Sequence, residues 1–355
     1  MMPLADQATV VRRPHYAMRG ERARFMVSTR DFRAFTSDEA RLFGRLESPA
    51  TVGSLRGVLG AGADAALRTL WAEELVEIID SRTRAGRRRV LVIEPHADDA
   101  ALSVGGSMWG RRDREEYVVA TLASRSNFTS YFYMDREYFD PAEVSTLRAR
   151  ESELFAGMVW GVHRGAGLAD AVLRYSDRAW TLDFFRRHRG SVSAVTSRRA
   201  AAGERERWTL AAAALIREVA SEELWLPLGS PHADHQLTVN AVLGALVGSP
   251  ELAAGRTVRL YQEVPYASRF PGYTGAMLEA LRGAGFVLEA EPWGIGAEMD
   301  AKMRLVSVYA SQFKMSKMRE DILACAAAGG EAAPSERTWV VRAMPARWPR
   351  DGVRP

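Results

Sequence analysis

Two short motifs combine histidines with carboxylates, which are the side chains that a hydrolytic metal site needs. The first reads EPHADDA and begins at Glu94, and the second reads GSPHADHQ and begins at Gly229. One histidine and one carboxylate from the first motif, with a histidine from the second, would hold zinc and leave a position open for water. Asp98 would then remain as a general base, and His232 as an acid or electrophile.

A structural alternative exists for the first motif. The HxDD string could cap a helix, with Asp98 or Asp99 accepting hydrogen bonds from the free N–H groups of the first turn. Two adjacent carboxylates beside a histidine at the end of a buried strand nevertheless need a partner of opposite charge, and a cation supplies it. We therefore favour the metal site over the cap.

The elements around the motifs follow an alternating pattern of strand and helix. Each motif comes directly after an apolar run typical of a strand buried on both faces, residues 90–93 and 224–228. Further strands are expected over 117–122 and 258–261, and helices over 100–108, 141–159 and 235–247. This pattern predicts an α/β fold, a Rossmann-like and mostly parallel sheet with helices on both faces. Ligands of such sheets bind beyond the carboxyl ends of the strands, so both motifs should meet in one crevice.

The first part of the chain has a different pattern. A helix is expected to start near Ser37, a second covers about 63–74, and a strand follows over 75–79. With the basic turn from Arg82 to Arg89, this arrangement resembles a winged-helix or PqqD-like module. We therefore predict a small N-terminal helical, winged-helix-like domain over residues 1–86 and a catalytic α/β domain over residues 87–355.

The paired motifs resemble the signatures of the PIG-L (LmbE-like) zinc-dependent deacetylases. That family's first motif reads roughly His-Pro-Asp-Asp-Glu, and its second reads His-Pro-Asp-His. Three further segments are similar to the family, and together they extend the resemblance over roughly residues 88–315: Leu102–Gly106, the helix 148–161, and Lys302 with the Tyr309–Gln312 stretch.

The resemblance implies a role for each residue of the motifs. His96, Asp99 and His235 would bind Zn²⁺. Asp98 would be the general base on the zinc-bound water, and His232 would assist the tetrahedral intermediate or protonate the leaving amine. Asp234 would orient His232 or a neighbouring ligand.

The resemblance also implies a reaction. It is the removal of an N-acyl group, foremost N-acetyl, from an aminosugar-like or specialised-metabolite intermediate, for example in antibiotic biosynthesis. The partner would be a small-molecule N-acylated substrate. A carrier or partner protein could bind the N-terminal module in addition.

Substrate contacts are expected from two loops that follow strands. Arg125 and Asn127 lie in the first, and Glu263 and Tyr266 in the second. Ala100 replaces the usual family glutamate, while Ala97 and Ala233 replace its prolines. Together with the aromatic loop 128–139, the loss of that carboxylate predicts a substrate bulkier or less sugar-like than free N-acetylglucosamine.

Composition excludes several other classes of protein. The 48 Lys and Arg residues against 44 Asp and Glu give a net charge of +4, too small to predict nucleic acid as a partner. The single cysteine, Cys325, excludes an intrachain disulfide framework and a cysteine-rich zinc site, and fits a cytoplasmic protein. No apolar stretch reaches the ~20 residues of a membrane span, so no membrane partner is expected.

Two other functions stay open at the level of sequence. One is a ligand-sensing regulatory or partner-binding protein that uses the N-terminal module. The other is a zinc hydrolase that cleaves a different C–N bond, such as the amide of a thiol conjugate.

Overall fold

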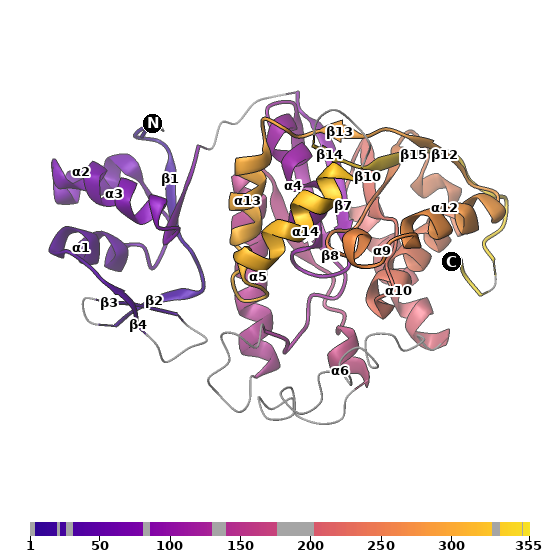
Figure 1. The fold of residues 1–355 in the computed structure, drawn as a ribbon, viewed down its shortest axis with the longest axis horizontal. Coiled ribbons are helices and arrows are strands. Elements are labelled where there is room, and N and C mark those ends of the chain that lie inside the picture. Colours follow the sequence, from indigo (N-terminus) through magenta and orange to yellow (C-terminus); the bar gives the residue numbers. More distant parts are fainter. Residues whose placement is uncertain are drawn as a thin grey trace.

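The fold is centred on a seven-stranded sheet (Figure 1). A computed structural model describes residues 4–19, 22–25, 31–80, 86–129, 140–175, 202–328, 334–349 and 351–355. The strand order is β12-β15-β11-β10-β7-β8-β9. The bounds of these strands are β7 Arg88–Glu94, β8 Glu115–Thr121, β9 Val162–Gly165, β10 Glu223–Pro227, β11 Thr257–Tyr261, β12 Val287–Ala290 and β15 Thr338–Ala343.

Strands β11, β10, β7, β8 and β9 pair in parallel, and β15 lies between β11 and β12 and pairs antiparallel with both. The predicted α/β class with a mostly parallel sheet is confirmed. From β7 the chain runs to β8 and β9 on one side, whereas β10 and β11 lie on the other side. The point where the order reverses lies between β7 and β10, which is where open α/β sheets bind ligands.

Helices cover both faces of the sheet, because the side chains of each central strand alternate between two apolar clusters. Val90 and Val92 pack with four helices on one face, and Leu91 and Ile93 pack with three helices on the other. The first group is α4 (Asp99–Arg111), α5 (Pro141–Met158), α13 (Met299–Ser307) and α14 (Met315–Ala327); the second is α9 (Ala202–Glu218), α10 (Ala233–Gly248) and α12 (Tyr273–Gly283).

Short elements complete this part of the chain. They are α6 (Ala171–Tyr175), the 3-10 helix η1 (Pro250–Leu252), α11 (Tyr266–Arg269), β13 (Trp293–Gly294) and β14 (Ser335–Glu336).

The N-terminal unit contains more strands than the sequence pattern predicted. Its helices are α1 (Ser37–Arg45), α2 (Val52–Leu59) and α3 (Gly62–Ala72), and its strands are β1 (Thr9–Arg12), β2 (Tyr16–Arg19), β3 (Arg22–Phe25), β4 (Asp31–Ala34), β5 (Ala50–Thr51) and β6 (Val76–Ile79). They form two three-stranded sheets, β5-β1-β6 and β2-β3-β4. A capping box of Thr36 and Glu39 begins α1. Because β1 to β4 are short and rich in arginine, no apolar run marks them.

The N-terminal unit packs against α5 and α13 (Figure 1). Strands β6 and β7 belong to different sheets, and part of the basic turn, residues 81–85, lies outside the described residues. The division at residue 86 stays a prediction. None of the helices in the described ranges has the length and apolarity to cross a bilayer.

Candidate metal centre and active site

Both motifs emerge at the carboxyl ends of adjacent strands. β7 ends at Glu94 and is followed by the His96 turn and α4, which begins at Asp99. β10 ends at Pro227 and is followed by α10, whose N-cap is His232. The two strands pair in parallel, so both turns open at the same edge of the sheet. The ends of β7 and β10 thus bring residues almost 140 positions apart into contact.

Three donor atoms converge on one point between these turns. His96 Nδ1 lies 3.1 Å from His235 Nε2, and Asp99 Oδ2 lies 3.4 Å from the former and 3.6 Å from the latter. Ligand atoms about 2.1 Å from a tetrahedral zinc ion lie about 3.4 Å from one another. The donor set and its spacing therefore fit Zn²⁺. We call His96, Asp99 and His235 the ligand triad.

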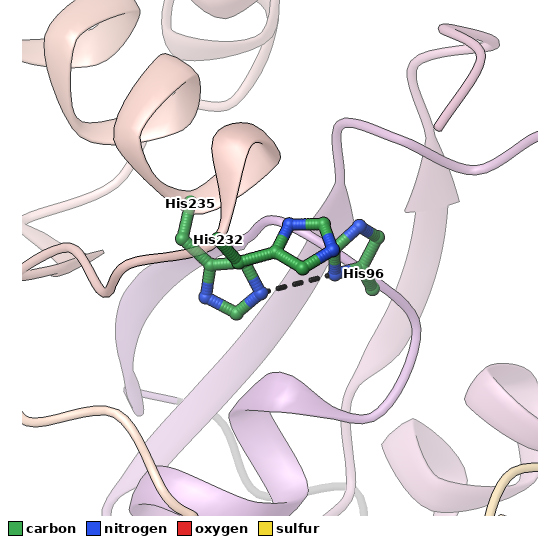
Figure 2. A group of neighbouring side chains, drawn as sticks. All are labelled: His96, His232 and His235. Atoms are coloured by element: carbon green, nitrogen blue, oxygen red, sulfur yellow. Dashed lines mark hydrogen bonds between the residues drawn. The ribbon is translucent and has the colours of Figure 1, made fainter. Parts of the chain in front are cut away.

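His232 lies beside the ligand triad and forms a three-histidine cluster with His96 and His235 (Figure 2). The ligand atoms of the three histidines lie within 4.8 Å of one another, a looser spacing than that of the ligand triad. His232 Nδ1 is already used, since it accepts a hydrogen bond from the backbone N–H of Asp234 at 3.1 Å. Only Nε2 of His232 is left to face a ligand.

Two buried carboxylates hold the histidines of the triad by their other ring nitrogens. Asp234 Oδ2 contacts His96 Nε2 at 2.8 Å, and Glu263 Oε1 contacts His235 Nδ1. A ring N–H that donates to a carboxylate fixes the tautomer and turns the opposite nitrogen toward the metal. Asp234 also accepts the backbone N–H of Ala171 and a hydrogen bond from Arg174, so its own position is fixed.

Asp98 is held in an unusual conformation next to the ligand triad. Its φ is 149°, a value that side-chain-bearing residues rarely adopt. Burial, and after it the negative charge of Asp99, raises the pKa of Asp98, although Arg148 and His96 act in the opposite direction. A carboxylate with a raised pKa is suited to accept a proton near neutral pH.

The pKa of His232 is shifted the other way. Burial lowers it well below its usual range, and the neighbouring charge of His96 lowers it further. His232 is therefore neutral, with the proton on Nε2 because Nδ1 accepts a hydrogen bond. In that state it can donate a hydrogen bond toward the site.

Of the residues expected to contact substrate, Tyr266 and Glu263 lie beside His235, and Arg125 and Asn127 lie in the first loop. The ring of Tyr266 lies 4.7 Å from that of His235, centre to centre, at an interplanar angle of 69°. Glu263 is buried against His235. Arg125 is exposed, and its backbone forms an isolated bridge with Ala169.

Asn127 is buried near the end of the described part of its loop. Its Oδ1 has no hydrogen-bond partner among the described residues. The aromatic residues of 130–139 lie outside the described residues, so the lid expected there is not described.

Several residues of the site lacked a sequence signal for their roles. Glu94, fully buried at the end of β7, accepts hydrogen bonds from Thr121 Oγ1 at 2.6 Å and the backbone N–H of Ala100 at 2.8 Å. It thereby caps the start of α4. Arg174 contacts Asp234, and Arg148 contacts the Asp98 turn. The contacts of Arg174 and Arg148 join residues 60 and 51 positions apart, so local spacing could not reveal these two.

Comparison with known proteins identifies deacetylases. The chain is 29% identical over 245 residues to the 2'-N-acetylparomamine deacetylase of Streptomyces fradiae, which covers 68% of this chain and 79% of that protein. No model of a known protein family matches.

Solved structures with the same fold include the deacetylase of teicoplanin biosynthesis in its bog complex, with TM-score 0.54, 22% identity and coverage of 71% and 97% of the two chains. A second is the zinc-inhibited form of teicoplanin deacetylase, with TM-score 0.53, 19% identity and the same coverage.

These relatives are deacetylases of the PIG-L (LmbE-like) type, the family that the motifs resemble. The sequence relation supports a hydrolytic N-deacetylase that acts on a non-peptide substrate. The winged-helix or PqqD-like identity of the N-terminal unit has no such support.

Proposed function

We propose that the protein is a zinc-dependent N-deacetylase that removes an acetyl group from an aminosugar-containing intermediate of antibiotic biosynthesis. The observation that carries the proposal is the ligand triad, whose three donor atoms face one point at tetrahedral spacing. The similarity to a deacetylase that acts on an N-acetylated aminosugar supports the substrate class.

His96, Asp99 and His235 are the proposed zinc ligands. Bound Zn²⁺ supplies a Lewis acid, which acidifies water and polarises an amide carbonyl. The protein's contribution is orientation: Asp234 and Glu263 hold the two imidazoles, and the buried Asp99 also accepts the His96 backbone N–H at 2.8 Å. We therefore propose that Glu263 supports His235, while the substrate contact expected of it from the sequence stays a prediction.

Asp98 is the proposed general base. It takes a proton from the attacking water and can return one to the leaving amine, and its raised pKa suits both transfers. His232 donates a hydrogen bond from Nε2 to the oxygen that becomes negative as the amide carbonyl is attacked. Because its pKa is lowered, we favour this donor role of His232 over that of a general acid.

Tyr266 is the proposed substrate contact nearest to the metal ligands. Its ring stands beside His235, and it stacks on Phe270 at 6.5 Å between ring centres, which gives the site an aromatic wall. Arg125 and Asn127 stay proposed contacts of the first loop. We expect weak or no turnover of free N-acetylglucosamine, as the substitution of Ala100 for the family glutamate suggests.

The N-terminal unit keeps two proposed attributes. The first is a winged-helix-like module, a proposal that the order α1, β5, α2, α3, β6 supports. The second is the binding of a carrier or partner protein, which no relative supports. A cytoplasmic location is also proposed, since the single cysteine is a buried free thiol.

The test is a deacetylation assay on purified protein whose bound metal has been measured. We expect one Zn²⁺ per chain and release of acetate from 2'-N-acetylparomamine or a related N-acetylated aminoglycoside, lost on chelation and restored by Zn²⁺. Free N-acetylglucosamine and an N-acylated thiol conjugate serve as competing substrates. A zinc-loaded protein that acts only on the thiol conjugate, or on none of these, contradicts the proposal.

A further inference from the structure

Behind the Asp98 turn, helix α5 buries two polar side chains, neither of which belongs to the ligand triad. Arg148 is 5% exposed and Glu151 is fully buried, and the two lie one helical turn apart. Burying a guanidinium group costs free energy unless its N–H groups find partners. The groups that Arg148 contacts therefore indicate its role at the site.

Arg148 contacts the backbone that sets the conformation of Asp98. Its Nη2 donates a hydrogen bond to the carbonyl oxygen of Ala97 at 3.1 Å and lies 3.9 Å from Asp98 Oδ1. The Ala97 carbonyl belongs to the peptide group whose orientation defines φ of Asp98, which is 149°. A non-glycine residue at such a φ costs roughly 1–3 kcal/mol and persists only where its surroundings hold it.

A second set of contacts bonds this helix to Ser311 of the α/β part and places it next to His15 of the N-terminal unit. Glu151 accepts hydrogen bonds from the backbone N–H of Ser311 at 3.1 Å and from its Oγ at 2.6 Å. On the same carboxylate, Oε1 lies 3.7 Å from Nδ1 of the fully buried His15.

Apolar contacts reinforce the link. Tyr16 and Phe35 of the N-terminal unit share a core cluster with Val144 and Leu147 of α5. The helix that carries Arg148 is thus packed against the N-terminal unit on one side and the sheet on the other.

We propose that Arg148 is a positioning residue for deacetylation, which holds the Ala97–Asp98 peptide so that Asp98 faces the reacting water, and that His15 of the N-terminal unit supports it by fixing α5. The inference rests on the proposed function. It gives the N-terminal unit a role in turnover that requires no binding partner.

The experiment compares four proteins, the wild type, Arg148→Ala, Arg148→Lys and the control Arg150→Ala, which changes an exposed residue of the same helix. For each, kcat and KM on an N-acetylated aminoglycoside are measured along with bound zinc. Misplacing a catalytic group by about 1 Å costs on the order of 10²-fold in rate. We expect a loss of that size in kcat for Arg148→Ala, with KM and zinc content near wild type and Arg150→Ala unchanged.

Rescue separates positioning from loss of stability. Added guanidinium ion should restore part of the kcat of Arg148→Ala, while Arg148→Lys should recover only a fraction, because an ammonium group lacks the planar fork. His15→Gln should lower kcat several-fold in the wild-type background and add nothing in the Arg148→Ala background, since both changes act on one support.

The outcomes distinguish the two proposals. A zinc-loaded wild type without deacetylase activity overturns both. An active wild type whose Arg148→Ala variant keeps its kcat overturns only the positioning role, and additive effects of His15→Gln and Arg148→Ala remove the N-terminal unit from it. If Arg148→Ala does not fold, an unchanged kcat in Arg148→Lys overturns the role instead.

Discussion

Each side chain proposed to act in this site depends on one or two buried neighbours. His96 and His235 present one ring nitrogen to the metal position because Asp234 and Glu263 occupy the other. Asp99 is fixed by the backbone N–H of His96. The same geometry distinguishes the proposed roles of the adjacent residues Asp98 and Asp99. Of the two, only Asp99 has an oxygen close to both His96 Nδ1 and His235 Nε2.

Asp98→Asn should keep the metal and lose most of the activity. The variant leaves the three proposed ligands in place but cannot accept a proton, and a general base contributes roughly 10²–10⁴-fold to rate. Steady-state kinetics on protein with measured zinc content gives the result. Near-wild-type kcat in a zinc-replete variant would show that another group is the base.

Asp234→Asn should weaken metal binding. The amide keeps the shape of the carboxylate but not the charge that fixes the His96 imidazole, and losing such a support typically costs 10–100-fold in metal affinity. Competition with a chromophoric chelator measures the change. Asp300→Asn, which alters an exposed carboxylate in α13, is the control and should bind zinc as the wild type does.

At the scale of elements, the site depends on where helices begin and on what their buried faces carry. Glu94 caps α4 from the end of the preceding strand, so that the helix starts at Asp99. Glu151 of helix α5 is buried in the core beside Ser311 and His15. Burial, together with the smaller effect of the Asp98 charge, raises the pKa of Glu151 to about 8, although its hydrogen bonds with Ser311 and the charge of Arg148 act in the opposite direction.

The raised pKa of Glu151 predicts a pH-dependent loss of stability. The unfolded carboxyl has a pKa of about 4.3, so from there to about pH 8 the folded state holds a proton that the unfolded state lacks. The free energy of unfolding should therefore fall as pH rises through this window, by up to about 1.4 kcal/mol per pH unit from this group. Full stability from Glu151 is present below its unfolded pKa.

Glu151→Gln provides the measurement, because the amide resembles the protonated acid and does not titrate. Urea unfolding from pH 5 to pH 8 should show a flatter decline in this variant than in the wild type. Parallel curves for the two proteins would mean that Glu151 does not carry the proton.

At the scale of the whole molecule, the N-terminal unit and the α/β part share buried ionic contacts as well as apolar ones. Arg13, 1% exposed, donates to Glu77 at 2.9 Å and to the Ser307 carbonyl and Oγ at 3.0 Å each. Arg304 of α13 reaches back to Glu77 at 2.8 Å. The buried carboxylate of Glu77 thus pairs with Arg13 of the N-terminal unit and with Arg304 of the α/β part.

Arg13→Ala should destabilise the protein strongly. It removes one of the two cations around the buried Glu77 and leaves polar groups of Ser307 unpaired, and breaking a buried pair costs about 3–5 kcal/mol. Urea unfolding measures the loss. Arg56→Ala is the matched control, since Arg56 pairs with Asp6 and Asp64 at the surface of the N-terminal unit and its removal should change little.

The α/β class and the two candidate motifs could be predicted from the sequence. Apolar runs mark strands buried on both faces, and a motif directly after such a run must lie at the carboxyl end of the strand. Both signals are local, so His96, Asp99 and His235 could be selected before their positions were known. The short strands β1 to β4 lack an apolar run, and the sequence did not predict them. They depend on pairing with distant or neighbouring strands, β1 with β5 and β6, and β2 to β4 with one another.

The side chains that support the site are brought to it by tertiary packing, and the sequence could not predict them. The carboxylate of Asp234 contacts His96 while its backbone N–H holds His232, and the carboxylate of Glu263 contacts His235. Arg148 meets the Asp98 turn from a helix 50 residues later, and His15 reaches that helix from the N-terminal unit. These partners are set by how helices pack on the sheet, and packing brings together residues whose separation along the chain leaves no periodic signal.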